Sequence, residues 1–436
     1  MRSYTFIEYI KVIGISTLNA RWFYGNPWRS IKKTKKYQEK QIKKLLIYAY
    51  KNTSLYYNKY KSAGVHPDDF KHLEDLNKFP TITKNEMIAH FSLNTTTEGT
   101  NNIKYINSVS SGSSGKIITI IHNPLDTWSY ALGRFRILNL LKNYKPWDKS
   151  LYIYTSPYPA KSYFGLYPSY FISTLNNLED TVVKIKKLKP KIISSYPSQM
   201  LELVKYFDKK EAQNLKLKLI SLGSELSTRS QRDELGKFFN CGVYDEYSSE
   251  ELGWVAGECE KKQYHISEDI SYIEILKLES DEKSTTGEIV GTNLHNFAMP
   301  FIRYRQGDLG IISENKECSC GRKFRVLDSF LGRENDTFKF FNGKTLPPAY
   351  LLDSVYALLL NEKIDLLDFC LIQESQTDVK LQIVAGKNFS ETDSLKIKYS
   401  LEKLIPAKIK VEAVSSKKLY KTTSGKRNPI ISKINI

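Results

Sequence analysis

Nine consecutive residues, Ser108 to Lys116, concentrate polar chemistry in one short segment that reads SVSSGSSGK. Glycines let a backbone fold closely around a ligand, and successive turned N–H groups form a concave site for anions. The serine hydroxyls add hydrogen-bond donors, and Lys116 adds a point charge suited to phosphate. The glycine spacing differs from that of the common G-x-x-x-x-G-K-[ST] loop. The segment predicts a phosphate site of another type, with a Gly/Ser-rich surface loop as the alternative.

A second group of polar residues follows segments with the pattern of parallel strands. Leu151 to Thr155, Ile192 to Ser195 and Leu217 to Leu222 are short apolar runs, and helical patterns follow the last two. Strand, small-residue turn and helix in succession indicate parallel β-α-β units, whose ligands bind at the carboxyl ends of the strands. We therefore expect one pocket, lined by Ser108 to Lys116, Tyr196, Gly223-Ser224-Glu225 and the segment from Asp245 to Glu251.

A strand with one polar face is indicated where Arg303 and Arg305 alternate with Ile302 and Tyr304. We expect this strand to end in a Gly-Asp turn that exposes the carboxylate of Asp308. An aspartate in a turn usually serves the turn alone. Two arginines on the strand that leads to it favour a role in binding ribose or phosphate.

From Phe338 onward the sequence indicates a small α+β unit of about 100 residues, within the usual size of a domain. Helical patterns cover residues 349–360 and 392–404, and strand patterns cover residues 369–373, 379–385 and 409–414. Near the end of the chain, Lys426 follows a Ser-Gly turn and precedes the apolar run from Pro429 to Ile431. A lysine in a flexible tail is usually inert, but this position predicts a lysine that is held in place.

The length of 436 residues exceeds one ordinary core, so two or more domains are expected. The net charge of +18 at pH 7 comes mainly from lysines spread along the whole chain. Solvated lysine faces account for that pattern, and no basic-aromatic motif favours a nucleic-acid partner. The lysines from Lys32 to Lys44 leave peripheral contact with an anionic membrane open.

The sequence does not indicate a membrane-spanning or secreted protein. No apolar run approaches the roughly 18 residues that a bilayer crossing needs, and the N-terminal segment lacks the order of regions of a signal peptide. Five cysteines form an odd, sparse set, which argues against a disulfide framework. We therefore expect a cytoplasmic protein without a transmembrane segment.

Three of the five cysteines and one histidine form a candidate metal set. Cys318 and Cys320 are separated by one residue, and Cys259 and His265 lie upstream. Three thiolates and one imidazole complete a tetrahedral structural zinc site. The spacing differs from that of a standard zinc ribbon, and unrelated free thiols are the alternative.

From about Lys44 to the C-terminus, the order of these motifs resembles the adenylate-forming (AMP-binding) superfamily. The nearest resemblance is to the phenylacetate–coenzyme A ligase branch, which includes proteins of capsular polysaccharide biosynthesis. The Ser/Gly-rich phosphate loop of the family matches residues 110–116, with serines in place of its usual threonines. Its hinge motif Gly-Arg-x-Asp-Asp matches residues 332–336, although Asn335 replaces the first aspartate. Some members of the branch carry a comparable Cys/His cluster, which supports the zinc hypothesis.

The resemblance implies a role for each matching residue. Asp308 would bind the ribose hydroxyls, Arg333 would contact the nucleotide, and Lys426 would be the mobile lysine of the adenylation step. Glu251 would hold Mg²⁺, although Glu250 beside it leaves this ligand open and only the spacing favours Glu251. The complete set of residues expected to bind the nucleotide, including one strand-end turn, is Ser110, Ser111, Gly112, Ser113, Ser114, Gly115, Lys116, Gly223, Ser224, Glu225, Tyr247, Ser248, Asp308 and Arg333.

The sequence thus predicts an α/β protein with a large multi-sheet N-terminal domain (residues 1–334) and a small α+β C-terminal lid (residues 335–436). It would join a carboxylic acid to AMP with ATP and Mg²⁺. It would then transfer the acyl group to coenzyme A or to an amine, with surface polysaccharide biosynthesis as one setting. A non-catalytic, basic, membrane-associated scaffold protein of a glycan assembly pathway is the alternative. Neither the acid nor the acceptor has a readable signature.

Overall fold

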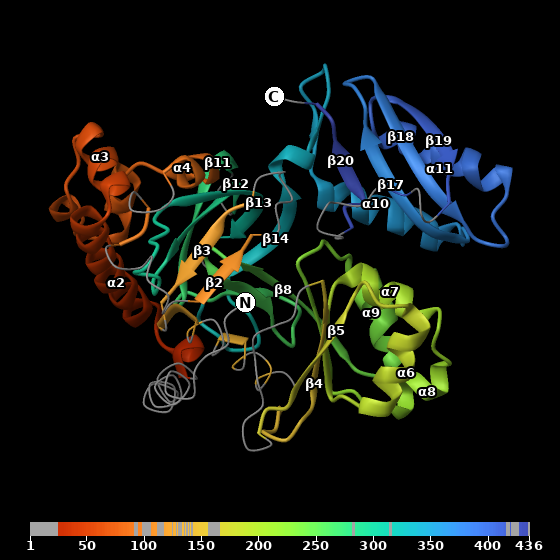
Figure 1. Ribbon diagram of the computed structural model, residues 1–436. Helices are drawn as coiled ribbons and strands as arrows, with labels where there is room; N and C mark the ends of the chain where they lie inside the picture. Colours follow the sequence, from red (N-terminus) through yellow and green to blue (C-terminus); the bar gives the residue numbers. More distant parts are fainter. Residues whose placement is uncertain are drawn as a thin grey trace.

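The computed structural model describes residues 25–90, 95–97, 106–110, 117–123, 125–127, 129, 133–134, 136, 138, 140, 143–155, 166–280, 284–313, 316–415, 419 and 427–434. A twelve-stranded sheet forms its centre, and a separate four-stranded sheet lies towards the C-terminus (Figure 1). Together with the helices that flank the strands, this confirms the predicted α/β class.

Half of the large sheet is parallel, in the spatial order β8-β7-β6-β4-β5. The helices α6 to α9 gather on one side of these strands (Figure 1). They cover an apolar core that includes Ile153, Ile193, Ile220 and Leu235. The bounds are β4 Ser150–Tyr154, β5 Ser169–Ser173, α6 Leu178–Leu188, β6 Ile192–Ser195, α7 Pro197–Val204, α8 Lys209–Asn214, β7 Leu219–Gly223, α9 Arg229–Phe239 and β8 Gly242–Ser249.

The other half is antiparallel and continues from β8 in the order β9-β10-β14-β13-β12-β11. Its bounds are β9 Gly253–Glu258, β10 Tyr264–Ile266, β11 Ser271–Ser280, β12 Ser284–Asn293, β13 Tyr304–Ser313 and β14 Val326–Arg333. The prediction of a turn that exposes Asp308 was wrong, because residue 308 lies inside β13 and only 3% of its surface is accessible. The strand continues because it pairs with β12 on one side and β14 on the other.

The N-terminal helices pack against the antiparallel half of the sheet. Ile42, Leu45 and Leu46 of α2 belong to the same buried cluster as Ile273 and Ile289 of the sheet. The bounds are η1 Asn26–Trp28, α2 Ile31–Asn52, α3 Ser54–Ser62, η2 Pro67–Asp69, η3 Leu73–Lys78, β1 Ile82–Thr83 and α4 Lys84–Ala89. None of the helices in the described part of the chain combines the length and apolar character that a bilayer crossing requires.

A short hairpin flanks the Ser/Gly-rich segment and brings Ser110 beside Ile118. Strands β2 (Ile106–Val109) and β3 (Thr119–His122) pair antiparallel, with Val109 opposite Thr119. The backbone N–H of Ser110 donates to the carbonyl of Ile118 at 3.0 Å. The hairpin therefore continues to the edge of the segment.

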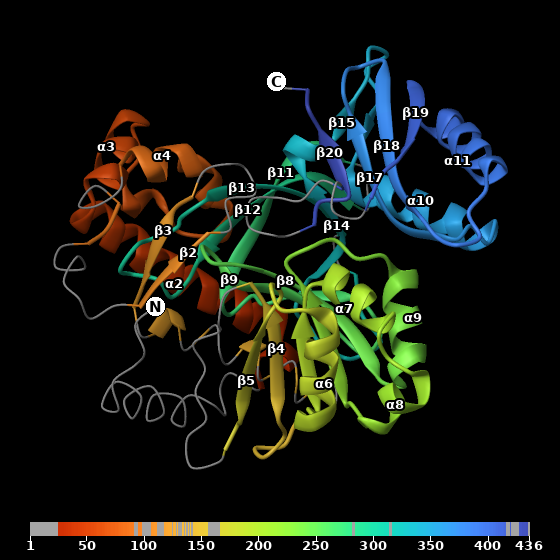
Figure 2. The same cartoon turned by 45° about the vertical axis from the view of Figure 1, so that its right-hand side comes forward.

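The C-terminal unit has its own sheet, in the order β19-β18-β17-β20, and its own core, which includes Phe338, Leu371, Leu381 and Ile397. Figure 2 shows it above the parallel strands. The predicted helices and strands of this part are confirmed, with ends shifted by a few residues. The bounds are η5 Glu334–Asp336, β15 Phe338–Lys339, β16 Thr345–Leu346, α10 Pro348–Asn361, β17 Leu366–Gln373, β18 Asp378–Ala385, α11 Glu391–Leu404, β19 Lys408–Ala413 and β20 Ile430–Ser432.

Asp269, between β10 and β11, joins two segments from other parts of the protein through a buried charge. Its Oδ2 accepts hydrogen bonds from Asn26 Nδ2 at 2.7 Å and Arg136 Nη1 at 2.8 Å. Its Oδ1 accepts from Arg136 Nη2 at 3.2 Å. The side chains of both charged partners are almost fully buried. Removing either one would leave the other charge without compensation in the interior.

We expect Asp269→Ala to lower the free energy of unfolding by about 3–5 kcal/mol, the range for breaking a buried ion pair. Urea unfolding followed by tryptophan fluorescence measures the change. Glu211→Ala is the matched control, since it removes the exposed partner of Lys186 and should cost less than about 1 kcal/mol. Equal effects of the two substitutions would contradict the assignment of Asp269 as a structural anchor.

Candidate functional site

Three of the predicted site residues meet where the parallel and antiparallel halves of the sheet approach each other. Tyr247 Oη of β8 donates a hydrogen bond to Asp308 Oδ2 of β13 at 2.8 Å. Arg333 Nε, at the end of β14, lies 2.9 Å from Asp308 Oδ1. Gln306 connects the same residues: its side-chain amide donates to Tyr247 Oη at 2.8 Å, and its carbonyl accepts from Arg333 Nη1 at 2.8 Å. The strand register therefore assembles a tyrosine, a carboxylate and a guanidinium.

Among the described residues, one oxygen of Asp308 has an ion-pair contact but no hydrogen bond. Asp308 Oδ1 is buried and accepts no hydrogen bond from any described residue, although it faces the charge of Arg333. Burial raises the pKa of this carboxyl, against the charge of Arg333 and the hydrogen bond from Tyr247. The ion pair with Arg333 offsets part of the cost of burying this oxygen, and a ligand hydroxyl that donates to it would add the hydrogen bond that no described residue makes. This oxygen fits a sugar hydroxyl.

Gly332 explains how Arg333 reaches this position. Its φ of +97° lies in a region that side-chain-bearing residues rarely adopt. A Cβ built at residue 332 would also lie 2.9 Å from Cβ of Pro348, the first residue of α10. Glycine therefore permits both the backbone turn and the close approach of α10 at the residue before Arg333.

The two neighbouring glutamates occupy different environments. Glu251 is buried, and Tyr304 Oη donates to its Oε1 at 3.3 Å. Burial raises the pKa of Glu251, while the charges of Lys84 and Arg333 act in the opposite direction. The Glu250 side chain is half exposed, and its Oε2 lies 4.0 Å from His122 Nε2. Glu251, rather than Glu250, faces the cluster that contains Arg333.

Glu225 connects the end of the parallel sheet with the C-terminal segment. Its Oε2 accepts from the backbone N–H of Ser198 at 3.2 Å, and its Oε1 accepts from the backbone N–H of Arg427 at 2.8 Å. The guanidinium of Arg427 pairs with Asp368 of β17. The residue that follows Lys426 in the chain is therefore held against the turn Gly223-Ser224-Glu225.

The turn that carries Glu225 is tightly packed. Gly223 ends β7, and a Cβ at this position would lie 2.6 Å from Cγ of Glu246. Glu246 in turn accepts a hydrogen bond from Ser221 Oγ at 2.5 Å. Tyr196, at the start of α7, lies two residues before Ser198 and contacts the ring of Tyr154 at 4.8 Å between centroids. Tyr196 and the turn Gly223-Ser224-Glu225 therefore lie at the carboxyl ends of the neighbouring parallel strands β6 and β7.

Of the remaining predicted residues, the structure describes only some. Ser110 is buried, and its Oγ accepts from the backbone N–H of Ile118 at 3.2 Å. Ser248 lies in β8 opposite Trp254. The residues Ser111, Gly112, Ser113, Ser114, Gly115, Lys116 and Lys426 lie outside the described residues.

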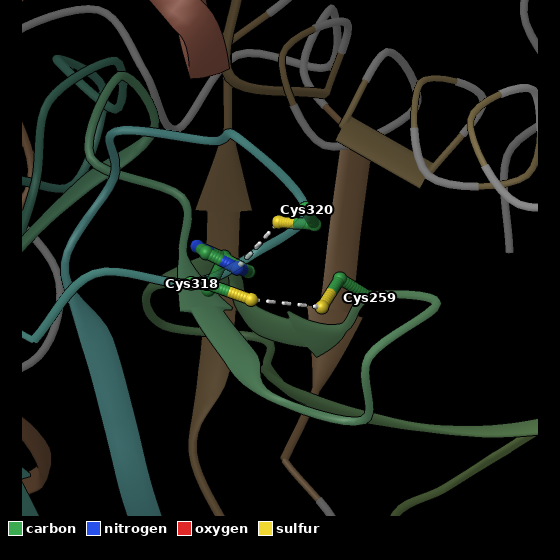
Figure 3. Close-up of side chains that lie close together, drawn as sticks. Cys259, Cys318 and Cys320 are labelled. Carbon is green, nitrogen blue, oxygen red and sulfur yellow. Dashed lines mark hydrogen bonds between the residues drawn. The ribbon is translucent and has the colours of Figure 1, made fainter.

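The predicted metal ligands lie together (Figure 3): Cys259 directly follows β9, His265 lies in β10, and Cys318 and Cys320 lie between β13 and β14. The ligand atoms of Cys259, His265, Cys318 and Cys320 all lie within 4.8 Å of one another. Cys259 Sγ is 3.7 Å from Cys318 Sγ, and Cys320 Sγ is 3.2 Å from His265 Nε2. Zn–S bonds of about 2.3 Å give sulfur–sulfur edges of about 3.8 Å in a tetrahedron. The donor types and separations fit a zinc ion.

The surroundings of His265 also suit a ligand. Its Nδ1 is hydrogen-bonded to the carbonyl of Phe324 at 3.1 Å, which leaves Nε2 directed at Cys320. Burial lowers the pKa of His265 to about 4, so the imidazole is neutral at pH 7, as metal binding requires. Arg322 pairs with Glu260 at 2.8 Å and so joins the two cysteine-bearing turns.

Sequence reasoning missed several residues that the structure places beside Glu250 and Glu251. Lys84, Tyr304 and His122 surround the two glutamates, and Asp126 is hydrogen-bonded to His122. The spacing of His122 and Asp126, four residues apart, was a readable signal. Lys84 had none, because it lies in a different part of the chain from every motif.

No family model matches the chain. The phenylacetate–coenzyme A ligase of Escherichia coli K12 is 28% identical over 339 residues, which cover 73% of this chain and 75% of that protein. The corresponding ligase of Thermus thermophilus is 26% identical over 69% of this chain and 70% of its own length. Protein CapK of Staphylococcus aureus is 22% identical over a shorter stretch, 37% of this chain and 35% of its own.

Solved structures show the same fold. A 2-hydroxyisobutyryl-CoA ligase in the postadenylation state superposes with a TM-score of 0.79 at 19% identity, over 94% of this chain and 91% of that one. An anthranilate CoA ligase gives 0.54 at 14% identity, over 73% of this chain and 65% of that one. The chain is therefore similar in sequence to the phenylacetate–coenzyme A ligases, and it shares its fold with acid–CoA ligases of known structure.

Proposed function

We propose that this protein activates a carboxylic acid with ATP and transfers the acyl group to coenzyme A. The observation that carries the proposal is the convergence of Tyr247, Asp308, Arg333 and Glu251 on one site, with Arg427 held at its edge. The relatives from Escherichia coli and Thermus thermophilus are phenylacetate–coenzyme A ligases, which supports the same reaction class here.

Each residue of the proposed nucleotide site has its own task in the first step. Asp308 Oδ1 accepts hydrogen bonds from the ribose, and Tyr247 holds the other oxygen of that carboxylate. Arg333 adds positive charge beside the nucleotide. Glu251 would hold Mg²⁺, which supplies charge neutralisation at the phosphates. Residues 110–116 bind the phosphates through backbone N–H groups and hydroxyls.

The chemistry requires positive charge because two anions must meet. A carboxylate oxygen attacks the α-phosphorus of ATP, an O–P bond forms, and the bond to pyrophosphate breaks. Positioned cations stabilise the charge that develops, and preorganised groups of this kind contribute roughly 3–4 kcal/mol each. Lys426 is the proposed cation for this step. The coenzyme A thiolate then attacks the acyl carbon, and AMP leaves.

We propose residues 1–334 as the domain that binds ATP and acid, and residues 335–436 as the mobile lid. The contact between Glu225 and Arg427 holds the lid in an arrangement that suits the first step, because it keeps the residue after Lys426 at the nucleotide side. The TM-score of 0.79 to the ligase in its postadenylation state, against 0.63 in its thioesterification state, supports this assignment. The second step would require this contact to break.

An amine acceptor and a role in surface polysaccharide biosynthesis form a second candidate. The resemblance of the motifs to the branch that includes proteins of capsular polysaccharide biosynthesis favours this setting, and Protein CapK matches 37% of this chain. ATP–pyrophosphate exchange across a panel of carboxylic acids identifies the acid. Mass spectrometry with coenzyme A or amines added then identifies the acceptor. Binding to anionic vesicles without exchange on any acid would instead favour the basic scaffold protein.

We also propose that Cys259, His265, Cys318 and Cys320 bind a structural zinc ion. The donor set and the separations of the ligand atoms support it. The cluster connects turns between strands of the large sheet and carries no step of the reaction.

Lys426→Ala is expected to abolish acyl-adenylate formation and to leave ATP binding nearly unchanged, because this lysine would act on the transition state. ATP–pyrophosphate exchange and calorimetric ATP binding measure the two effects. Lys433→Ala is the control, since Lys433 lies in the same C-terminal segment and pairs with Glu374 on the surface. Wild-type exchange by the Lys426 variant would refute the assignment.

Asp308→Ala is expected to raise the KM for ATP by at least about 10-fold, since two hydrogen bonds to a charged acceptor would be lost. The KM for the acid should change little. Steady-state exchange kinetics at varied ATP and varied acid separate the two. Asp328→Ala is the control, because Asp328 lies on β14 and pairs with Lys316. An unchanged KM for ATP in the Asp308 variant would remove the ribose role.

Protein purified without chelator is expected to contain about one zinc per chain, and Cys318→Ser/Cys320→Ser to contain much less. Elemental analysis by mass spectrometry measures the content. Cys370→Ser is the control, because this buried thiol belongs to the C-terminal unit. Well under one zinc per wild-type chain would end the proposal.

A further inference from the structure

A continuous hydrogen-bonded network of side chains connects two parts of the proposed ATP site. Ser108 Oγ lies 2.6 Å from His122 Nε2, and His122 Nδ1 lies 2.6 Å from Asp126 Oδ2. The other oxygen of Asp126 accepts from Asn293 Nδ2 at 2.9 Å. Asn293 Nδ2 also donates to the carbonyl of Glu251 at 3.1 Å.

Asp126 and Asn293 of this network are buried, Ser108 and His122 are partly buried, and each of the four side chains has a hydrogen-bond partner. The side chains of His122 and Asp126 are 11% and 5% exposed, and Asn293 has no accessible surface. The side-chain oxygen Oδ1 of Asn293 accepts hydrogen bonds from the backbone N–H groups of His295 and Asn296. Buried polar networks of this kind are rigid when every group has a partner, and the loss of one member leaves others unsatisfied.

The two ends of this hydrogen-bonded network indicate what it does. Ser108 lies in β2, two residues before Ser110, where the Ser/Gly-rich segment leaves the hairpin. The opposite end is the backbone of Glu251, the proposed Mg²⁺ ligand. The hydrogen-bonded network therefore runs from the start of the segment that would bind the phosphates to Glu251, the residue that would hold Mg²⁺ beside those phosphates.

Ser108, His122 and Asp126 have the residue types of an acyl-transfer triad, but the surroundings favour another role. Ser108 lies within the paired part of β2, opposite Ile120 of β3, and not at a turn. A nucleophilic serine must approach an acyl carbon, so it normally stands at a sharply turned, accessible position. A serine within a strand ladder suits a role in holding that strand.

We propose that His122 is a positioning residue for the adenylation step, which couples β2 to Glu251 through Asp126 and Asn293. It keeps the phosphate-binding segment and the Mg²⁺ ligand at a fixed separation while pyrophosphate leaves. This inference rests on the proposed function. It assigns His122, Asp126 and Asn293 to a reaction that the sequence motifs did not connect with them.

The test uses Ser108→Ala, Asp126→Asn and the double variant, because residues 108 and 126 are connected through His122. ATP–pyrophosphate exchange gives kcat, the KM for the acid and the Mg²⁺ concentration at half-maximal rate. Thioester formation from supplied acyl-adenylate reports the second step. Asn107→Ala is the control, since this residue is the exposed neighbour of Ser108 on the same strand.

We expect each single variant to lower kcat of exchange by about 10-fold to 100-fold, as small displacements of reacting groups do. Each should also raise the half-maximal Mg²⁺ concentration, while thioester formation and the KM for the acid stay unchanged. The double variant should be no slower than the slower single variant, since both break one coupled unit. Asn107→Ala should match the wild type in every measurement.

Additive losses in the double variant, or equal losses in both half-reactions, would overturn the proposal and indicate a structural role alone. Faster hydrolysis of acyl-adenylate by the wild type than by Ser108→Ala would also overturn it, in favour of a nucleophilic serine. Exchange by the wild type with unchanged single variants would reject this inference and leave the proposed function standing. A wild type inactive with every acid would reject both.

Discussion

The pairing of β13 with β14 places Asp308 directly opposite Arg333, and the site depends on this register. A carboxylate with 3% accessible surface is tolerated because a guanidinium and a tyrosine hydroxyl face it. Tyr247 comes from β8, at the junction of the parallel and antiparallel halves of the sheet. The polar cluster therefore depends on both halves keeping their mutual position, and Gly332 allows the backbone to reach it.

A second constraint is the contact between the C-terminal segment and the turn after β7. Glu225 holds two backbone N–H groups, one from α7 and one from Arg427, so one carboxylate joins both units. Hydrogen bonds of this kind are strong enough to favour one arrangement and weak enough to exchange within a catalytic cycle. The separate core of the C-terminal unit, around Phe338 and Leu371, lets it move as a body in the proposed second step.

The cluster of Cys259, His265, Cys318 and Cys320, which we propose to bind zinc, and the hydrogen-bonded network through His122 have a similar structural effect at two different places. Both connect turns and strands that lie far apart in the sequence, such as Cys259 with Cys318 and Asp126 with Asn293. A large open sheet with long connections needs such links, because hydrophobic packing alone does not fix the positions of loops. Polar contacts with defined geometry do so.

The sequence by itself determined the local elements and the order of the motifs. The strand at residues 192–195 and the helix near residues 349–360 follow from apolar periodicity, which depends only on neighbouring residues. Only the tertiary structure decided that Asp308 is buried, because two register shifts between β13 and β14 set its partner. It also placed Glu251 in the interior, left Glu250 half exposed, and linked His122 to Asn293 through Asp126. Such choices depend on contacts between distant strands, and no local pattern records them.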